Sequence, residues 1–295
     1  MLIKAPAKIN LSLKVLSKRA DGYHEISSLM RAIRLFDEME IATGQDRSGS
    51  YSVRLKIEQN MDSPLFLSDG PENLIHRAAD LVQKEWSIRP CADIFLRKKI
   101  PVAAGLGGGS ADAAAILLWL ASKYRPEAGI RDIASLGARL GADVPFCVYS
   151  VAAANPQLGY KGAAAMVADG IGEVLSPAAL ECRAWVVLVK PRIEIRTSQV
   201  YALFDSLQKT NAMSDNDLEA PCADAWPIVA GVLSSLKEIC LSEGAEETKV
   251  MLSGSGPAVF AYFQEGPEPE TTAFRVYERS KEFFKEMFVS IIETL

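Results

Sequence analysis

A glycine-rich segment at residues 101–112 most constrains what this chain can fold into. It reads P-V-A-A-G-L-G-G-G-S-A-D and places four glycines within five residues. Before it, residues 92–100 alternate as a strand does, with Ile94, Leu96, Lys98 and Ile100 on one face. After it, residues 111–124 are rich in Ala and Leu and lack Gly and Pro, which predicts a helix. The segment therefore connects a strand to the start of a helix.

Such a connection is suited to binding an anion. Glycine admits positive φ and has no Cβ, so a bulky ligand can come close to the main chain. The N–H groups of the loop and of the first helical turn would point at one spot, where the helix dipole also favours negative charge. The alternatives are a flexible linker or a plain tight turn, but linkers are usually flanked by Ser, Pro and polar residues. We therefore expect a phosphate-binding loop.

The glycine loop lacks a positive charge of its own. No Gly-Lys-Ser/Thr follows the glycines, so it is not a Walker A loop. The spacing Gly105-x-Gly107-x-x-Ser110 is a poor dinucleotide fingerprint, because it ends in Ser and no acidic residue marks a second strand downstream. A bound phosphate must therefore obtain positive charge from elsewhere in the chain.

The composition excludes several classes of protein. The chain has 295 residues, 49% hydrophobic and 23% charged, which is ordinary for a globular protein of one large domain or two. A net charge of −5 argues against nucleic-acid binding, and no apolar run approaches ~18 residues, so no membrane span is expected. The N-terminus has no signal-peptide pattern. Five scattered cysteines without a C-x-x-C pair fit a cytoplasmic protein, and two histidines argue against a histidine metal site.

Two polar segments near the N-terminus leave structural and functional readings open. Residues 2–16 predict a strand whose polar face carries Lys8 and Asn10, and a surface strand would explain that face without any function. Residues 19–24, R-A-D-G-Y-H, predict an Asp-Gly turn. The turn is either a hairpin loop with incidental side chains or the rim of a ligand site, with Tyr23 offering a stacking face and His24 a hydrogen-bonding edge.

Two further polar residues also allow both readings. Asn73 opens a predicted helix at 73–86 and could simply cap it. Asp143 lies between a predicted helix at 130–140 and an apolar run at 144–151 that we interpret as a strand. There it could be a turn residue or a carboxylate at the wall of a site, where burial and a neighbouring cation would set its protonation.

The second half of the chain predicts alternating strands and helices. Residues 151–168 predict a mobile loop or a long hairpin near a boundary between domains at 1–168 and 169–295. A strand is predicted at 185–190, helices at 198–208 and 227–242, and a glycine turn at 253–256 that leads into a strand. The tail predicts an amphipathic helix followed by a short apolar end.

Three of these segments together resemble the motifs of the GHMP small-molecule kinases. They are P-A-K-I-N at 6–10, the glycine loop at 101–110 and L-S-G-S-G at 252–256. D-G-Y-H at 21–24 and G-A-D-V-P at 141–145 narrow the resemblance to the kinases that act on a cytidylated methylerythritol in the non-mevalonate isoprenoid pathway. The resemblance extends from residue 4 to about residue 263.

The resemblance implies a fold and a reaction. The fold would be α/β, an α+β two-lobed GHMP kinase fold with an N-terminal ribosomal S5 domain 2-like lobe and a C-terminal ferredoxin-like lobe. The N-terminal lobe would contain a left-handed β-α-β crossover, and the active site would lie between the lobes. The reaction would be ATP-dependent phosphorylation of the tertiary 2-hydroxyl, with ATP and Mg²⁺ required. The partners would be small molecules, ATP and the cytidylated methylerythritol, without nucleic acid or membrane, and the protein would be a monomer or weak homodimer.

The resemblance also implies a role for individual residues. Asp143 would be the catalytic base, and Lys8 would stabilise it and supply the positive charge that the loop lacks. Tyr23 and Tyr201 would sandwich the cytosine, His24 would hydrogen-bond its edge, and Asn10 and Thr197 would lie on the substrate side. Beyond Ser110, no protein ligand of Mg²⁺ can be named. The ATP-binding residues would be Pro101, Val102, Ala103, Ala104, Gly105, Leu106, Gly107, Gly108, Gly109, Ser110 and Ala111, with Asn73 near the adenosine.

The chain departs from the family pattern in two places. Roughly ten extra residues lie near 151–161, before D-G-I-G-E at 169–173, which puts the geometry beside the substrate pocket in doubt. Ala111 stands where Ser is common, a change that keeps a backbone donor.

Two other functions compete with the first. A mevalonate or homoserine kinase is disfavoured by D-G-Y-H and Tyr201, because those acceptors have no base to stack on. A non-catalytic nucleotide-binding protein is disfavoured by the intact pair of Lys8 and Asp143.

Overall fold

The computed structural model describes residues 1–43, 51–59, 67–180, 182–207, 214–264 and 268–295. They form two compact units: residues 1–8, 35–102 and 107–177 in the first, and residues 9–34, 103–106 and 178–295 in the second. The units interleave along the chain because the long strands β1 (Leu2–Lys18) and β2 (His24–Thr43) contribute residues to both. The predicted domains, in contrast, are continuous stretches, and that assignment stays a prediction.

The first unit contains a mixed sheet with both parallel and antiparallel strand pairs. Strand β3 (Ser52–Gln59) pairs in parallel with β4 (Cys91–Lys98), which pairs antiparallel with β2. Strands β5 (Ala165–Gly170) and β6 (Val174–Pro177) are antiparallel neighbours. The strand order of this sheet is β3-β4-β2-β5-β6, with β1 also paired to β2. The predicted strands at 2–16 and 92–100 are therefore confirmed, with small shifts at their ends.

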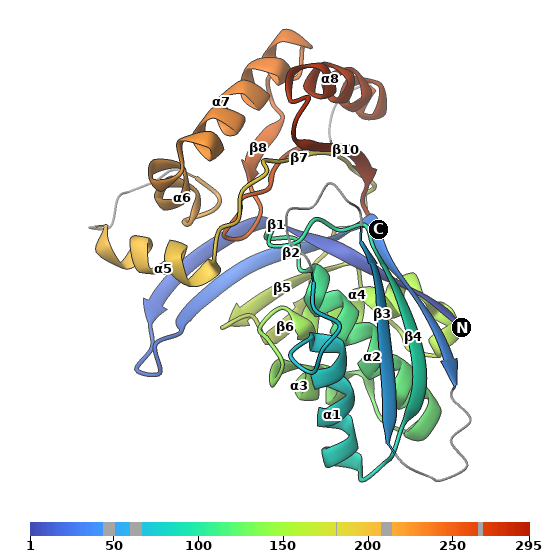
Figure 1. The fold of residues 1–295 in the computed structure, drawn as a ribbon. Coiled ribbons are helices and arrows are strands. Elements are labelled where there is room, and N and C mark those ends of the chain that lie inside the picture. Colours follow the sequence, from blue (N-terminus) through green and yellow to red (C-terminus); the bar gives the residue numbers. More distant parts are fainter. Residues whose placement is uncertain (44–50, 60–66, 181, 208–213, 265–267) are drawn as a thin grey trace. The chain divides into compact units, whose positions relative to one another are not determined.

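Helix α2 (Gly108–Tyr124) forms the centre of the first unit. It packs against α1 (Leu74–Trp86), α3 (Ile130–Ala138) and α4 (Val144–Ala154), and Figure 1 shows these helices gathered beside β3 and β4. All residues from Ala111 to Ala121 of α2 are buried, and the alanines among them let neighbouring helices approach closely. Each fully buried Leu or Ile on α2 contributes about 1.5–3 kcal/mol.

The apolar run at 144–151 is a helix, and our prediction of a strand there is wrong. The run is apolar on every side, and it is buried at Val144–Val148 and again at Ser150–Ala152, so no periodicity distinguishes a helix from a strand. Pro145 fits the first turn of α4, where its missing N–H breaks no hydrogen bond.

Residues 151–168 are also more regular than predicted. They comprise the end of α4, a short 3₁₀ helix (η1, Pro156–Leu158) and the start of β5. Gly162 lies against the end of α4, where an added Cβ would be 2.1 Å from the Ala153 nitrogen. The Asn155 amide donates hydrogen bonds to the carbonyls of Lys4 and Val151, at 2.7 Å each, and accepts one from the Lys4 nitrogen at 2.9 Å. This segment thus joins the end of α4 to the start of β1.

The second unit contains a four-stranded antiparallel sheet in the order β10-β7-β9-β8. Its strands are β7 (Trp185–Lys190), β8 (Lys249–Leu252), β9 (Val259–Phe263) and β10 (Phe288–Glu293). Helices α5 (Thr197–Ser206), α6 (Glu219–Ala225) and α7 (Pro227–Ser242) precede β8, and α8 (Pro269–Phe283) precedes β10. This order of elements and strands is ferredoxin-like, as predicted.

The elements of the second unit can be compared with those predicted from the sequence. The predicted strand at 185–190 and the predicted helix at 227–242 are found with those bounds. The short apolar end of the chain is β10, which pairs with β7. Helix α6 was not predicted, because seven residues with an internal proline carry no clear period.

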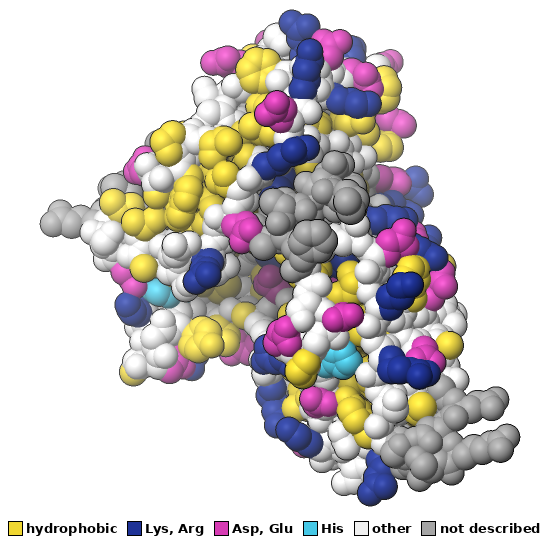
Figure 2. Space-filling view, in the orientation of Figure 1, with side chains coloured by type: hydrophobic (Ala, Val, Ile, Leu, Met, Phe, Trp, Pro, Cys, Tyr) yellow, Lys and Arg dark blue, Asp and Glu magenta, His cyan; other side chains and the backbone are white. Residues whose placement is uncertain are grey.

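No single described helix is long and apolar enough to cross a membrane. Among the described helices, α6 and α7 taken together have the length and composition of a span, but they are bent by 117° relative to each other. Acidic and basic side chains are interspersed on the face seen in Figure 2.

Candidate functional site

Lys8 and Asp143 form an ion pair in the first unit. The Lys8 ammonium comes from β1 and lies 3.3 Å from the Asp143 carboxylate at the start of α4. The Lys8 side chain is only 5% exposed, so the reading of a surface strand is wrong at this position. An ammonium group is buried at low cost only when it has a charged partner, and Asp143 provides one.

Asp143 keeps its carboxylate accessible. It occupies the N-cap position of α4 with φ −81° and ψ −16°, and within the described chain its side chain makes no capping hydrogen bond. The side chain is 33% exposed. The carboxylate can therefore contact Lys8 and still accept a proton from a hydroxyl group brought in by a ligand.

The glycine loop lies directly against Lys8. Gly107 has φ +69°, and a Cβ added there would be 2.9 Å from Lys8 Cγ and 3.3 Å from Lys8 Cε. Only glycine therefore fits, both for its backbone conformation and for its contact with the lysine. Lys8 is thus a cation beside the loop, the charge that the loop itself lacks.

The start of α2 offers backbone donors to an anion. Gly107 is the N-cap residue, and none of the described side chains caps this helix. The first-turn N–H groups are therefore open to an external acceptor. Ala111 differs from these groups, because its N–H donates to the Gly107 carbonyl at 2.9 Å and its side chain is fully buried, and its contact with ATP stays a prediction.

Residues 103–106 of the loop belong to the second unit. Gly105 has φ +76°, and a Cβ there would be 2.2 Å from the Ser253 carbonyl oxygen. Ser253 Oγ donates to the Gly105 carbonyl at 3.1 Å, and the Ala258 N–H donates to the Ala104 carbonyl at 3.2 Å. The side chains of Ala104 and Leu106 are buried, so only their main chain could contact a ligand. The two predicted glycine turns therefore pack against each other.

Asn216 is a residue of this region that the sequence reasoning missed. Its amide donates to the carbonyls of Leu252 and Gly254, at 2.9 and 2.8 Å, and fixes the turn at 253–256. Beside this turn, Thr197 Oγ1 lies 3.0 Å from Ser255 Oγ. Thr197 is thus placed next to a glycine turn, whereas its contact with a substrate stays a prediction.

Asn73 caps the start of helix α1, which is the structural role that its position suggested. Its side-chain oxygen accepts a hydrogen bond from the Ile75 N–H, and its amide group donates to the Ser68 carbonyl. Helix α1 does lie beside the loop, because a Cβ added to Gly109 would be 3.4 Å from Leu74 Cδ1. The contact of Asn73 with adenosine stays a prediction.

The predicted base-binding residues lie in the second unit. His24 is 9% exposed, its Nε2 lies 2.7 Å from Asp205 Oδ1, and its ring stacks on Tyr201 with centroids 4.7 Å apart. Tyr23, beside the turn, is 59% exposed. Asn10 is buried and donates to Ser28 Oγ at 2.7 Å. Because Tyr201 contacts the His24 ring, the sandwich of a base between Tyr23 and Tyr201 stays a prediction.

A buried charge cluster behind the loop was also missed. Lys98 Nζ donates to Asp37 and to Asp112 Oδ2, the latter at 2.7 Å, and Asp37 Oδ1 accepts the N–H groups of Lys99 and Ile100. Burial raises the pKa of Asp112 to about 7, although Lys98 pulls it down. The sequence held one signal, a lysine on the apolar face that carries Ile94, Leu96 and Ile100.

A dedicated metal centre is not found in the described part of the chain, which has no group of three or more His, Cys, Asp or Glu side chains able to hold an ion. Ser110 in the loop and Asp143 beside Lys8 each carry a side-chain oxygen that could face such an ion. Mg²⁺ usually keeps several waters and binds through one or two protein oxygens together with substrate phosphates. This donor set therefore fits an ion that arrives with a phosphorylated ligand.

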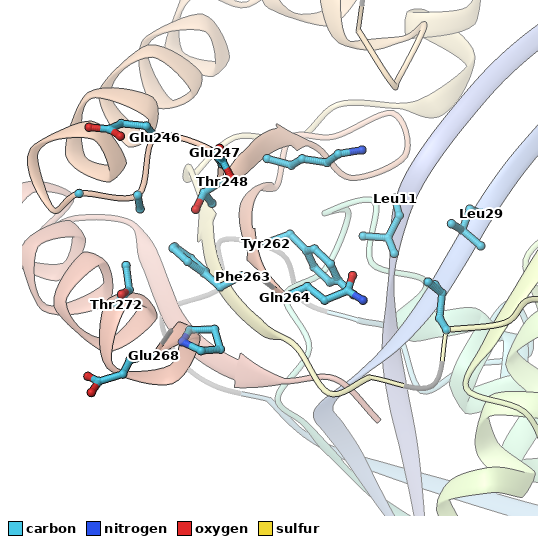
Figure 3. A pocket seen from close by; sticks show the side chains of 15 residues that line it. Leu11, Leu29, Glu246, Glu247, Thr248, Tyr262, Phe263, Gln264, Glu268 and Thr272 are labelled. Atoms are coloured by element: carbon cyan, nitrogen blue, oxygen red, sulfur yellow. The ribbon is translucent and has the colours of Figure 1, made fainter. Parts of the chain in front are cut away.

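A separate cavity of about 540 Å³ opens in the second unit. Figure 3 shows Leu11, Tyr262 and Phe263 among the side chains that line it, with Glu246 and Glu268 farther along. The lining includes none of the predicted site residues within the described chain. Cavity size alone therefore does not locate the chemistry.

Comparison with known proteins supports one family. The model of the GHMP kinases N terminal domain matches residues 73–151. The 4-diphosphocytidyl-2-C-methyl-D-erythritol kinase of Brevibacillus brevis is 34% identical over 97% of this chain and 94% of its own length. The protein of the same name from Geobacillus thermodenitrificans is 36% identical over 97% of this chain and 94% of its own length.

Solved structures agree with these relatives. A crystal structure of 4-(cytidine 5'-diphospho)-2C-methyl-D-erythritol kinase matches with a TM-score of 0.70 and 30% identity, covering 99% of both chains. A homoserine kinase from Cytophaga hutchinsonii matches with a TM-score of 0.64 and 18% identity, covering 100% of this chain and 94% of its own. At that identity the second match shows the fold alone, and together they confirm the predicted GHMP kinase fold.

Proposed function

This chain belongs to the 4-diphosphocytidyl-2-C-methyl-D-erythritol kinase family, and on that premise we propose that it phosphorylates the 2-hydroxyl of this cytidylated compound with ATP, giving the 2-phosphate and ADP. Family membership confirms the resemblance found in the sequence. The reaction is an ATP-dependent small-molecule kinase reaction, and the roles of single residues are part of the proposal.

The ion pair of Lys8 and Asp143 beside Gly107 is the observation that carries this proposal. It places a cation, an accessible carboxylate and a glycine N-cap in one region of the first unit. A phosphoryl transfer needs little more than these parts, because its catalysis is mostly positioning and stabilisation of charge.

Each part has a distinct task in the proposed reaction. Asp143 orients the attacking hydroxyl group and accepts its proton at a carboxylate oxygen. Lys8 stabilises the negative charge on Asp143 and on the transferred phosphoryl group. The open N–H groups at the start of α2 hold phosphate oxygens of the nucleotide. Loss of the base costs on the order of 10²–10⁴ in rate.

Mg²⁺ is part of the proposal as an ion carried by the nucleotide. Ser110 and Asp143 are the residues whose oxygens would hold it from the protein side. When bound, the ion would neutralise phosphate charge as the phosphoryl group moves.

Substrate recognition is proposed for the second unit. His24 would hydrogen-bond the base edge, Tyr23 and Tyr201 would contact its faces, and Asn10 and Thr197 would lie near the polar groups. The burial of His24 and its contact with Asp205 support this assignment, since an imidazole held in place offers a directed hydrogen bond.

The test measures ADP release with a panel of acceptors. We expect release with 4-diphosphocytidyl-2-C-methyl-D-erythritol, and none with mevalonate or homoserine. Asp143→Ala and Lys8→Met should abolish most of the release. The matched control is Lys14→Met on the same strand, whose ammonium bonds Ser214 and Asp217 instead, and it should keep activity.

Two results would overturn parts of this proposal. Full turnover in Asp143→Ala, in protein with an unchanged circular dichroism spectrum, would exclude the assigned base. Release of ADP with homoserine or mevalonate alone would identify a different acceptor.

The remaining assignments concern the oligomeric state, the compartment and the partners. We propose a monomer or weak homodimer that acts in the cytoplasm without nucleic acid or membrane. The net charge of −5 argues against a nucleic-acid partner, and the five scattered cysteines without a C-x-x-C pair fit a cytoplasmic protein. Light scattering of the purified protein tests the oligomeric state.

A further inference from the structure

Three residues of helix α5 hold the imidazole ring of His24. Tyr201 stacks on the ring at 4.7 Å between centroids, and Phe204 meets it edge-on at 6.4 Å. Asp205 Oδ1 lies 2.7 Å from Nε2. Tyr201, Phe204 and Asp205 are spaced i, i+3, i+4, so one face of α5 forms a socket for this ring. All four residues belong to the second unit.

Asp205 determines which ring nitrogen carries the proton. Lys18 Nζ donates to Asp205 Oδ2 at 2.6 Å. That hydrogen bond, followed by the one from His24, lowers the pKa of Asp205, so the group is a carboxylate at neutral pH. An ionised carboxylate only accepts hydrogen bonds. The nitrogen that faces it, Nε2, must therefore carry hydrogen.

The other ring nitrogen is left for a ligand. In a neutral imidazole with hydrogen on Nε2, Nδ1 is an acceptor. Within the described chain no hydrogen bond engages His24 Nδ1, and this atom is not among the enclosed side-chain atoms that lack a partner. A ligand atom placed against Nδ1 must then be a donor. Cytosine carries an amino group at its 4-position, where uracil carries a carbonyl oxygen.

We propose that Asp205 is a positioning residue that fixes His24 in its Nε2–H tautomer and thereby makes the site select cytosine over uracil. This inference rests on the proposed function, because it takes the base of the cytidylated substrate as the group that meets His24. Asp205 acts only through His24 and does not itself contact the substrate.

A simpler role for Asp205 would be to anchor the turn at 19–24 to α5 through Lys18 and His24. Under that role, loss of the carboxylate would loosen the turn and weaken every pyrimidine ligand equally. Under the tautomer role, the loss would change the position of one proton and would weaken the cytosine ligand alone. The two roles therefore predict different measurements.

The first experiment reads the tautomer directly. The chain has two histidines, so protein labelled with ¹⁵N at histidine gives two sets of long-range ¹H–¹⁵N correlations, and His76→Gln assigns them. Spectra are recorded at increasing pH until the histidine nitrogen shifts no longer change, and the tautomer is read there. We expect the Nε2–H pattern for His24 in the wild type and in Lys18→Met. In Asp205→Asn we expect a mixture, because an amide can accept or donate.

The second experiment measures selectivity with CMP and UMP as inhibitors that compete with the cytidylated substrate. Asp205→Asn should lower the preference for CMP on the order of tenfold, the effect of one lost hydrogen bond. The KM for the cytidylated substrate should rise while kcat changes little. Lys18→Met should keep the wild-type preference. If Asp205→Asn does not fold, Asp205→Ser supplies the same loss of charge in a smaller side chain.

Each outcome decides the matter. An Nδ1–H pattern in the wild type, an unchanged pattern in Asp205→Asn, or equal weakening of CMP and UMP would overturn the inference. If the wild type prefers CMP and Asp205→Asn loses that preference, but no ADP is released with the cytidylated substrate, the proposed function fails and only the role of Asp205 in base selection stands. If ADP is released and the Asp205 variants keep their preference, only the inference fails.

Discussion

Replacing Lys98 with methionine should destabilise the first unit strongly. The side chains of Lys98, Asp37 and Asp112 are 3%, 0% and 5% exposed, so the substitution removes the cation from a buried cluster with two carboxyl groups. Asp37 retains the N–H groups of Lys99 and Ile100. Asp112 loses its hydrogen bond at Oδ2, and its Oδ1 already lacks a partner within the described chain. Removing one member of a buried ion pair costs about 3–5 kcal/mol.

We expect the lower end of this range at pH 7. Burial already raises the pKa of Asp112 to about 7, so without Lys98 this group can take up a proton and avoid a buried unpaired charge. The free energy of unfolding should therefore fall by about 3 kcal/mol. Adding Asp112→Asn to Lys98→Met should not lower stability further, because a neutral amide requires no cation.

Urea unfolding measures these differences, and hydrogen exchange of the α2 amides shows whether the loss is confined to the first unit. Lys99→Met is the matched control, because Lys99 pairs with Glu38 at the surface with its side chain 52% exposed. Its effect should be within about 1 kcal/mol. A Lys98→Met protein as stable as the Lys99→Met control would refute the reasoning, as would a double variant much weaker than the single one.

Three further predictions follow from the same unit and from the cysteines. The pKa of Asp112 is raised from 3.8 to about 7 in the folded state, so the folded protein holds this proton more tightly than the unfolded chain. The stability of the wild type relative to Asp112→Asn should therefore fall as pH rises from about 4 to 7, and unfolding measured across this range would show it. Gly107→Ala should lower kcat by on the order of tenfold or more by displacing Lys8, whereas Gly159→Ala, with φ +83° and nothing within 4 Å, isolates the effect of backbone strain in a kinetic assay. A thiol reagent should modify exposed Cys182 first and leave Cys147 unmodified in the native protein, because burial raises the pKa of the Cys147 thiol far above its usual value, and mass spectrometry after a timed reaction would identify the sites.

Local sequence patterns predicted most of the elements of this fold. The helix at 227–242 was predictable because its apolar residues recur at helical spacing after Pro227, and the strand at 185–190 because its mostly apolar run is only six residues long and is followed by Pro191. The helix at 144–154 was not, because an apolar stretch buried on all sides reads equally well as a strand. Strand order and register could not be predicted from the sequence, since pairs such as Phe288 with Lys190 depend on contacts between residues far apart in the chain.

The candidate site was predictable only where its residues form motifs. Lys8, Asp143 and the glycine loop were named from the sequence, and the structure brings Lys8 to both of the others. Asp205 lies outside any motif, and its importance follows only from its contact with His24 across 181 positions of sequence. Lys98 could have been noticed, because a lysine on an apolar strand face requires a buried anion.

The segment around Asn155 shows that the extra residues near 151–161 have a structural role that their sequence did not suggest. Asp143 at the start of α4 meets Lys8 of β1, and Asn155, just after the end of α4, is hydrogen-bonded to Lys4 nearer the start of β1 and to Val151 of α4. The two elements are therefore held together at two places, and the hydrogen bonds of Asn155 act as a clamp. A chain built in this way can vary the length of the segment after Asn155, whereas shortening the clamp itself would change the distance between the base and its lysine.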